Sequence, residues 1–170
     1  MRPGSTPRAF RDTLGQFASG ITVIGGLVGD TPTGFTCQSF YSVSVEPPLV
    51  SFSVKVDSTT YPNIRDIGRF SVNVLAHDQD PIADQFARRG TDKWAGVDWT
   101  ASRNRNPIIA GTLMWLDCDL AAEHAAGDHY IVVGSVNEMS PPGWHVREPL
   151  LYFRGRYRRL CGHRPVGEPA

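Results

Sequence analysis

The chain has 170 residues, of which 41% are hydrophobic and 20% charged, a composition typical of a single globular domain. Lys plus Arg and Asp plus Glu both number 17, so the chain lacks the basic excess of nucleic-acid binders and membrane-surface proteins. Its three cysteines, Cys37, Cys118 and Cys161, form no CxxC pair, which argues against a disulfide framework and a zinc site. We therefore expect a soluble, cytoplasmic protein without a metal.

Two short helices are predicted. Thr6 followed by Pro7 marks a helix start. An apolar stripe at helical spacing follows, formed by Phe10, Leu14 and Phe17, and it stops at Gly20. A second helix begins at Asp80-Pro81 and ends near residues 89–90, with three apolar residues expected to point inward: Ile82, Ala83 and Phe86.

Elsewhere the apolar residues alternate with polar ones, which is the period of a half-buried strand. Strands are predicted at 21–28, 43–45, 49–56, 70–75, 114–120, 130–136 and 150–154, with turns at 29–32, 46–48 and 125–128. Acidic and histidine residues near the 125–128 hairpin are assigned to its solvated face rather than to a metal: Asp117, Asp119, Glu123 and His124. Because no βαβ alternation and no GxGxxG motif occur, a mainly β, small antiparallel barrel is the predicted architecture.

The densest polar segment is residues 33–40, and a second polar segment, residues 55–60, comes at the end of the next long strand; we expect both to face one mouth of the barrel. Hydroxyls, backbone N–H groups and an ammonium are what a phosphate monoester requires. Lys55 is one of only two lysines in the chain, the other being Lys93. The alternative is that Ser and Thr are ordinary strand and turn residues here, with Lys55 a solvated edge charge.

Eight segments follow one another in order along residues 10–160: 17–23, 34–40, 42–50, 58–59, 70–75, 85–87, 127–129 and 149–157. Together they resemble the flavin reductase family of the FMN-binding split barrel, and within it the small reductase components of two-component monooxygenases. The resemblance implies an antiparallel Greek-key split β-barrel with short flanking helices. It also implies a flavin-binding domain at 10–160, between an N-terminal extension (1–9) and a loose C-terminal tail (161–170).

The resemblance further implies an NAD(P)H:flavin oxidoreductase. Such a protein is a homodimer that reduces FMN or FAD with NADH or NADPH and releases the reduced flavin to a separate monooxygenase. Because the flavin carries the redox chemistry, the protein needs neither a nucleophile nor a metal. The implied flavin contacts are Thr36, Cys37, Gln38, Ser39, Ser53, Val54, Lys55, Ser58, Thr59, Phe86, Ala87 and Arg88, with Ser58 and Thr59 at the phosphate. The implied nicotinamide contacts are His129, Arg154 and Tyr157.

Each of these assignments has a plainer alternative. His129 is otherwise a polar turn residue, Tyr157 a core residue and Arg154 an ion-pair partner. Trp94 and Trp99 either cover the flavin or pack the end of the barrel. Gln38 stands where relatives often carry Asn or Ser, and residues 139–148 match no family feature.

For the whole protein, the alternative is a flavin-binding or storage protein of the same fold without nicotinamide turnover. Oxidation of pyridoxamine phosphate on a related barrel ranks third, because it needs more cationic residues around a second phosphate than the chain offers.

Overall fold

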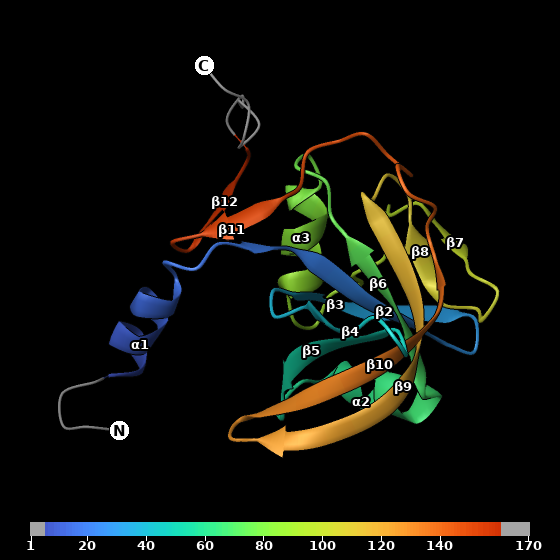
Figure 1. Ribbon diagram of the computed structural model, residues 1–170, viewed down its shortest axis with the longest axis horizontal. Coiled ribbons are helices and arrows are strands. Elements are labelled where there is room, and N and C mark those ends of the chain that lie inside the picture. The colour runs from blue at the N-terminus through green and yellow to red at the C-terminus, as the bar shows by residue number, and fades with distance from the viewer. Residues whose placement is uncertain (1–5, 161–170) are drawn as a thin grey trace.

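The computed structural model describes residues 6–160, whose body is a seven-stranded antiparallel sheet (Figure 1). The strands lie in the order β3-β2-β6-β9-β10-β5-β4. Their bounds are Thr22–Val28 (β2), Thr31–Cys37 (β3), Tyr41–Ser44 (β4), Leu49–Lys55 (β5), Arg69–Val74 (β6), Met114–Ala126 (β9) and His129–Met139 (β10). The mainly β, antiparallel prediction is confirmed. Within residues 6–160, β3 and β4 are the two edges of the sheet, so its hydrogen bonds do not close into a barrel.

Two smaller sheets and three helices complete the described part of the chain. One sheet has the order β1-β11-β12, formed by Ser19–Gly20, Leu151–Phe153 and Arg156–Arg158, and the other pairs β7 (Trp99–Ala101) with β8 (Pro107–Ile109). The helices are α1 (Pro7–Leu14), α2 (Tyr61–Ile67) and α3 (Asp80–Ala87). Both predicted helices are confirmed, whereas α2, β1, β3, β7, β8 and β12 were not predicted from the alternation. The predicted C-terminal tail, 161–170, lies outside the described residues.

The alternating strands bury one face in the core, as predicted. Phe52, Phe70 and Val132 come from three different strands and have no exposed surface. Tyr61 and Ile64 of α2 close one end of this cluster, and Phe86 of α3 belongs to a second cluster with Val23 and Leu75. The two helices therefore cover the sheet at different places, and α3 lies beside β3 (Figure 1).

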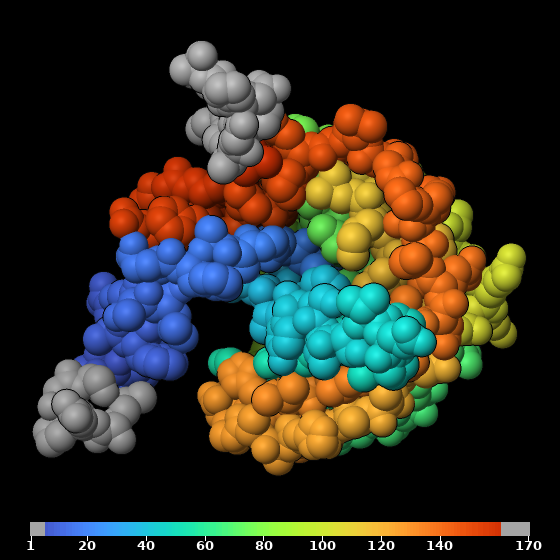
Figure 2. Space-filling model, in the orientation of Figure 1, coloured from blue at the N-terminus to red at the C-terminus, as the bar shows by residue number. Residues whose placement is uncertain are grey.

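In the N-terminal arm, residues 6–20, α1 ends at Leu14, before the predicted stop at Gly20, so Phe17 lies beyond the helix. The predicted apolar stripe is largely exposed: Phe10, Leu14 and Phe17 are 54%, 55% and 79% exposed. Figure 2 shows the arm standing out from the molecule, with a hollow between it and the β9–β10 hairpin. The helix was predictable from local signals, but what its apolar face contacts was not, because residues 6–160 leave that face largely exposed.

Asp117 is a correction to the predicted solvated face of the hairpin. Its side chain is fully buried, and Oδ1 accepts hydrogen bonds from Asn106 Nδ2 at 2.9 Å and Asn104 Nδ2 at 3.4 Å. The loop that precedes β8 covers this part of β9, so amides take the place of water at Oδ1, whereas Oδ2 is buried without a hydrogen-bond partner among the described residues. Asp119 and His124 are exposed, as expected for that face, whereas Glu123 is half-buried and pairs with Arg65.

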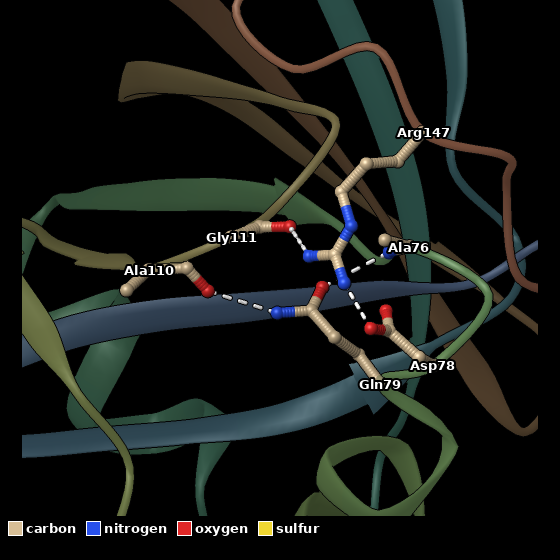
Figure 3. Close-up of polar contacts among 6 residues, drawn as sticks. All are labelled: Ala76, Asp78, Gln79, Ala110, Gly111 and Arg147. Carbon is tan, nitrogen blue, oxygen red and sulfur yellow. Dashed lines mark hydrogen bonds and ion pairs between the residues drawn. The ribbon is translucent and has the colours of Figure 1, made fainter.

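The segment between β10 and β11 is fastened to the loop that begins α3 (Figure 3). Arg147 donates to the Gly111 carbonyl at 2.9 Å and pairs with Asp78. Gln79, next to Asp78, accepts from the Ala76 N–H and donates to the Ala110 carbonyl, each at 2.9 Å. These bonds fix the start of α3, and α3 is the helix that borders the cavity described next.

Candidate functional site

A cavity of about 460 Å³ lies between β3, β5, the turn after β5 and the end of α3. It is lined by Phe35, Thr36, Cys37, Gln38, Ser39, Ser53, Val54, Lys55, Ser58, Thr59, Thr60, Phe86, Ala87, Arg89, Lys93 and His129. Of the twelve residues predicted to contact flavin, Arg88 alone is not in this lining. The two polar segments singled out in the sequence therefore do face one space, together with His129.

The wall formed by β3 and α3 depends on close backbone approach. A Cβ added at Gly34 would lie 2.8 Å from the Ile24 carbonyl oxygen and 3.0 Å from Cε1 of Phe86. Two residues later, Thr36 Oγ1 donates to the Ala83 carbonyl at 2.6 Å. Glycine at position 34 lets α3 lie directly on the strand, and the threonine hydroxyl then ties the two together.

The opposite wall joins the end of β3 to β5 through one hydroxyl. Ser39 Oγ accepts from the Ser53 N–H at 2.8 Å and donates to the Ser53 carbonyl at 3.1 Å. Cys37 Sγ lies 3.4 Å from the same hydroxyl, and burial raises the pKa of this thiol. A protonated, buried thiol is a poor nucleophile, so Cys37 is a wall residue and not a covalent catalyst.

The turn after β5 presents hydroxyl groups to the cavity. Its backbone is closed by a bond from the Ser58 N–H to the Lys55 carbonyl at 3.1 Å. Ser58 Oγ accepts from the Tyr61 N–H at 3.2 Å, which leaves its own hydrogen available to donate. Thr59 is exposed beside it. This end of the cavity can therefore donate hydrogen bonds to an anion.

Two basic residues that the sequence reasoning did not assign also line the cavity, Lys93 and Arg89. Lys93 Nζ donates to the Gly34 carbonyl at 3.2 Å and to Thr60 Oγ1 at 3.5 Å. Burial, and secondarily the charge of Arg89, lowers the pKa of this ammonium. Both lysines of the chain thus face the same cavity. Because the chain has only two lysines, this scarcity was the signal that could have identified Lys93 as a cavity residue.

Arg89 takes the place predicted for Arg88. The helix α3 ends at Ala87 and Arg88 is extended, which turns the following side chain to the cavity. Arg89 Nη2 lies 3.1 Å from Asp57 Oδ2 and, through this hydrogen bond, lowers the pKa of that carboxyl. Adjacent arginines after a helix cannot be told apart by sequence pattern, because the backbone of the loop decides which one turns inward.

His129 begins β10 opposite Lys55 of β5. Its Nδ1 lies 2.8 Å from Asp128 Oδ1, and the hydrogen bond lowers the pKa of Asp128. Because an ionised carboxylate can only accept, Nδ1 carries the hydrogen, and Nε2 is the ring nitrogen left for a ligand. The imidazole is 37% exposed, so it is partly fixed and still accessible.

The structure does not bring Arg154 and Tyr157 to the cavity. Arg154 donates through Nε and Nη2 to Gln16 Oε1, at 2.9 and 2.7 Å, and so holds the base of the N-terminal arm. The Tyr157 hydroxyl donates to Asp84 Oδ1 at 2.9 Å, and burial together with this carboxylate raises the pKa of the phenol. Both side chains fasten the β11–β12 hairpin to its neighbours.

Trp94 packs within the protein. Its ring lies 4.8 Å from that of Phe86 and 5.9 Å from that of Trp99, measured between centroids, and 8% of the residue is exposed. The packing interpretation of the two tryptophans is therefore confirmed. Phe86, Trp94 and Trp99 thus form one aromatic cluster.

Within residues 6–160, no group of three or more His, Cys, Asp or Glu side chains is arranged to hold a metal ion. In the same part of the chain, no helix has the length and apolar character needed to span a membrane.

Comparison with known proteins gives one consistent result. Residues 14–161 match the sequence family described as "Flavin reductase like domain". The reductase subunit HsaB of a flavin-dependent monooxygenase from Mycobacterium tuberculosis is 45% identical over 151 residues, covering 89% of this chain and 81% of that protein.

Two solved structures are similar over almost their whole length. Nitrilotriacetate monooxygenase component B from Mycobacterium thermoresistibile superposes with a TM-score of 0.89 at 38% identity, covering 95% of this chain and 92% of the other. The NADH:FAD oxidoreductase SgcE6 of Streptomyces globisporus, in complex with NAD and FAD fragments, gives 0.85 at 33% identity, with coverage of 95% and 94%.

Proposed function

Because the chain belongs to the flavin reductase family, we propose that it oxidises NADH or NADPH with FMN or FAD as the acceptor and supplies reduced flavin to a separate monooxygenase. The observation that carries this proposal is the single cavity in which donors for an anion and His129 line one space. Apolar side chains, such as Phe35 and Val54, line the same cavity and suit a flat aromatic ring.

The residues present fit a flavin. Bound flavin supplies the hydride acceptor, so the chain needs only to bind, orient and shield the reactants. Residues 36–39 and 53–55 would hold the ring and ribityl chain, largely through backbone groups, and Phe86 and Ala87 would cover the far side. Ser58 and Thr59 would donate to the phosphate. Arg89 replaces Arg88 in this assignment, because Arg89 lines the cavity.

His129 is the proposed contact for the nicotinamide. Asp128 orients its ring through Nδ1, so Nε2 would meet the carboxamide of the second substrate or stand near the proton that reaches reduced flavin. Because Arg154 and Tyr157 are bonded elsewhere, the proposed nicotinamide contact rests on His129 alone.

The proposal is tested by following oxidation of NADH and of NADPH by the purified protein with FMN, FAD, riboflavin or no added flavin. We expect oxidation of at least one nicotinamide, and only when flavin is present. A flavin-binding or storage protein of this fold would bind FMN without consuming either nicotinamide. That outcome, or turnover in protein shown to be free of flavin, would overturn the proposal.

The phosphate end gives a first prediction. Thr59→Ala should weaken FMN binding by about 1–3 kcal/mol, the range for a hydrogen bond to a charged group. Ser58→Ala should do the same and also destabilise the fold by about 0.5–2 kcal/mol, because Ser58 caps the Tyr61 N–H. Titrations of FMN and riboflavin into each variant measure this. An equal loss for riboflavin would move the phosphate elsewhere.

We propose, in addition, that the protein is a homodimer. The stripe of Phe10, Leu14 and Phe17 is exposed in the single chain, and an eight-residue helix is not stable in water without a surface to pack on. A second copy related by twofold symmetry would cover both arms at once. Light scattering of the purified protein tests this, and a monomer that still binds flavin would contradict it.

We also infer that the open side between β3 and β4 is the split of a Greek-key barrel. The bonds of Ser39 to Ser53, which bridge the end of β3 to β5, support this inference.

A further inference from the structure

One ion pair joins two segments that border the phosphate end of the cavity. Arg89 lies just after α3 and Asp57 in the turn after β5, next to Ser58 and Thr59. Their side chains meet at 3.1 Å and are 63% and 62% exposed. Arg89 lines the cavity, and Asp57 does not.

The charges around this end are unequal. Lys55, Lys93 and Arg89 line the cavity, and its lining among the described residues includes no Asp or Glu. Lys93 is already held by the Gly34 carbonyl and the Thr60 hydroxyl, so its position is fixed before a ligand arrives. Arg89 differs from Lys93, because its partner is a carboxylate at the surface that water can solvate in its place.

Resting on the proposed function, we propose that Asp57 competes with the flavin phosphate for Arg89 and thereby sets how tightly phosphate-bearing flavins are held. A guanidinium binds a phosphate with the same paired N–H geometry that it uses for a carboxylate, and a phosphate carries the greater charge. Exposed ion pairs of this kind are weak, so the exchange of partners costs little. When the phosphate leaves, Asp57 takes Arg89 back.

Such competition suits a protein that passes its flavin on. A phosphate held by Arg89, Lys93 and the turn hydroxyls without any competitor would dissociate slowly, since affinity differences lie mostly in the dissociation rate. Asp57 offers Arg89 an alternative partner in the ligand-free state and so lowers the net gain on binding. The carboxylate therefore favours release of FMN or FAD and has no such effect on riboflavin, which has no phosphate.

The experiment measures dissociation constants of FMN and riboflavin for the wild type, Asp57→Asn, Arg89→Gln and the double variant. Asp57→Asn should tighten FMN binding by about two- to fivefold, the range expected from an exposed ion pair, and leave riboflavin unchanged. Arg89→Gln should weaken FMN binding. In the Arg89→Gln background, the further change Asp57→Asn should have no effect, because the competed group is gone.

Asp30→Asn is the matched control. Asp30 pairs with Arg105 at 2.6 Å on the β2–β3 turn, and neither residue lines the cavity. This variant changes the net charge as Asp57→Asn does and should leave FMN affinity unchanged.

Two results would overturn the competition. Asp57→Asn without effect on FMN would show that Asp57 does not compete for Arg89, and an equal gain in the Arg89→Gln background would show simple charge repulsion. Either result leaves flavin-dependent oxidation of the nicotinamide by the wild type intact. Failure of the proposed function would instead abolish that oxidation with every flavin, so the two failures are distinguishable.

Discussion

The wall of the cavity and the N-terminal arm use the same kinds of residue in opposite ways. Phe86 has no exposed surface and packs on Trp94, whereas Phe17 in the arm is 79% exposed. A Cβ at Gly34 in the wall would meet the Ile24 carbonyl and the Phe86 ring, whereas a Cβ at Gly20 in the arm would meet no atom within 4 Å. The cavity wall is thus completed by packing within one chain, and the arm has an apolar face that the described residues, 6–160, leave largely exposed.

The largest expected difference between the two regions concerns the phenylalanines. Phe86→Ala should destabilise the folded chain by about 3–5 kcal/mol, because it leaves a hole between α3, Trp94 and β3. Phe17→Ala, the same substitution in the arm, should change the free energy of unfolding of the monomer by about 0.5 kcal/mol or less. Urea unfolding at protein concentrations low enough to keep the chain monomeric measures both.

For dimer formation the order of the two variants should be reversed, with Phe17→Ala having the larger effect. Phe17→Ala should weaken the dimer, as followed by light scattering over a dilution series, because it removes apolar area from the proposed interface. If Phe17→Ala destabilises the isolated monomer as much as Phe86→Ala does, the arm packs on its own chain and the contrast is wrong.

Gly34 in the wall and Gly20 in the arm should also differ in how much an added methyl group lowers stability. Gly34→Ala should cost about 1–3 kcal/mol of stability, because the new methyl group meets the Ile24 carbonyl and the Phe86 ring in a packed wall. It should also weaken flavin binding, since α3 must move away from β3. Gly20→Ala has open space and should be close to neutral. Thermal unfolding with and without FMN tests both, and a neutral Gly34→Ala would mean that α3 is not held against the strand.

Elements with a clear pattern of burial could be predicted from the sequence, and short elements without one could not. Strands such as 49–56 and 70–75 were predictable because alternation reports burial on one face, and Phe52 and Phe70 are fully buried. The helix α2 was missed because seven residues carry too little periodicity. Pro62 in its first turn and Gly68, left-handed at φ 73° just after it, were the available signals.

For the candidate site, the residues of β3, β5 and the turn after β5 could be predicted, whereas the cavity residues that follow α3, Arg89 and Lys93, were missed. The family resemblance implied Ser53, Val54 and Lys55 of β5, and the structure brings all three to the cavity. Lys93 lies on a loop whose path depends on the packing of Trp94, which no local pattern specifies. The burial of Asp117 has the same cause, because Asn106 reaches it from a loop eleven residues away in sequence.

The last prediction concerns His129 and Tyr157, which the resemblance grouped at the nicotinamide and the structure separates. His129 lines the cavity, whereas Tyr157 is bonded to Asp84 at the foot of the β11–β12 hairpin. His129→Ala should raise the apparent KM for the nicotinamide by about two- to tenfold, as expected for one lost hydrogen bond, and should lower kcat as orientation is lost. FMN affinity should be nearly unchanged, because the phosphate and ring contacts lie on other elements.

Tyr157→Phe should instead cost about 0.5–1.5 kcal/mol of stability and leave the rate per flavin-loaded site unchanged. Steady-state kinetics, FMN titration and unfolding of the same preparations decide between the roles: unchanged kinetics for His129→Ala would remove it from the site, and a matching rise in KM for Tyr157→Phe would extend the nicotinamide site to the hairpin.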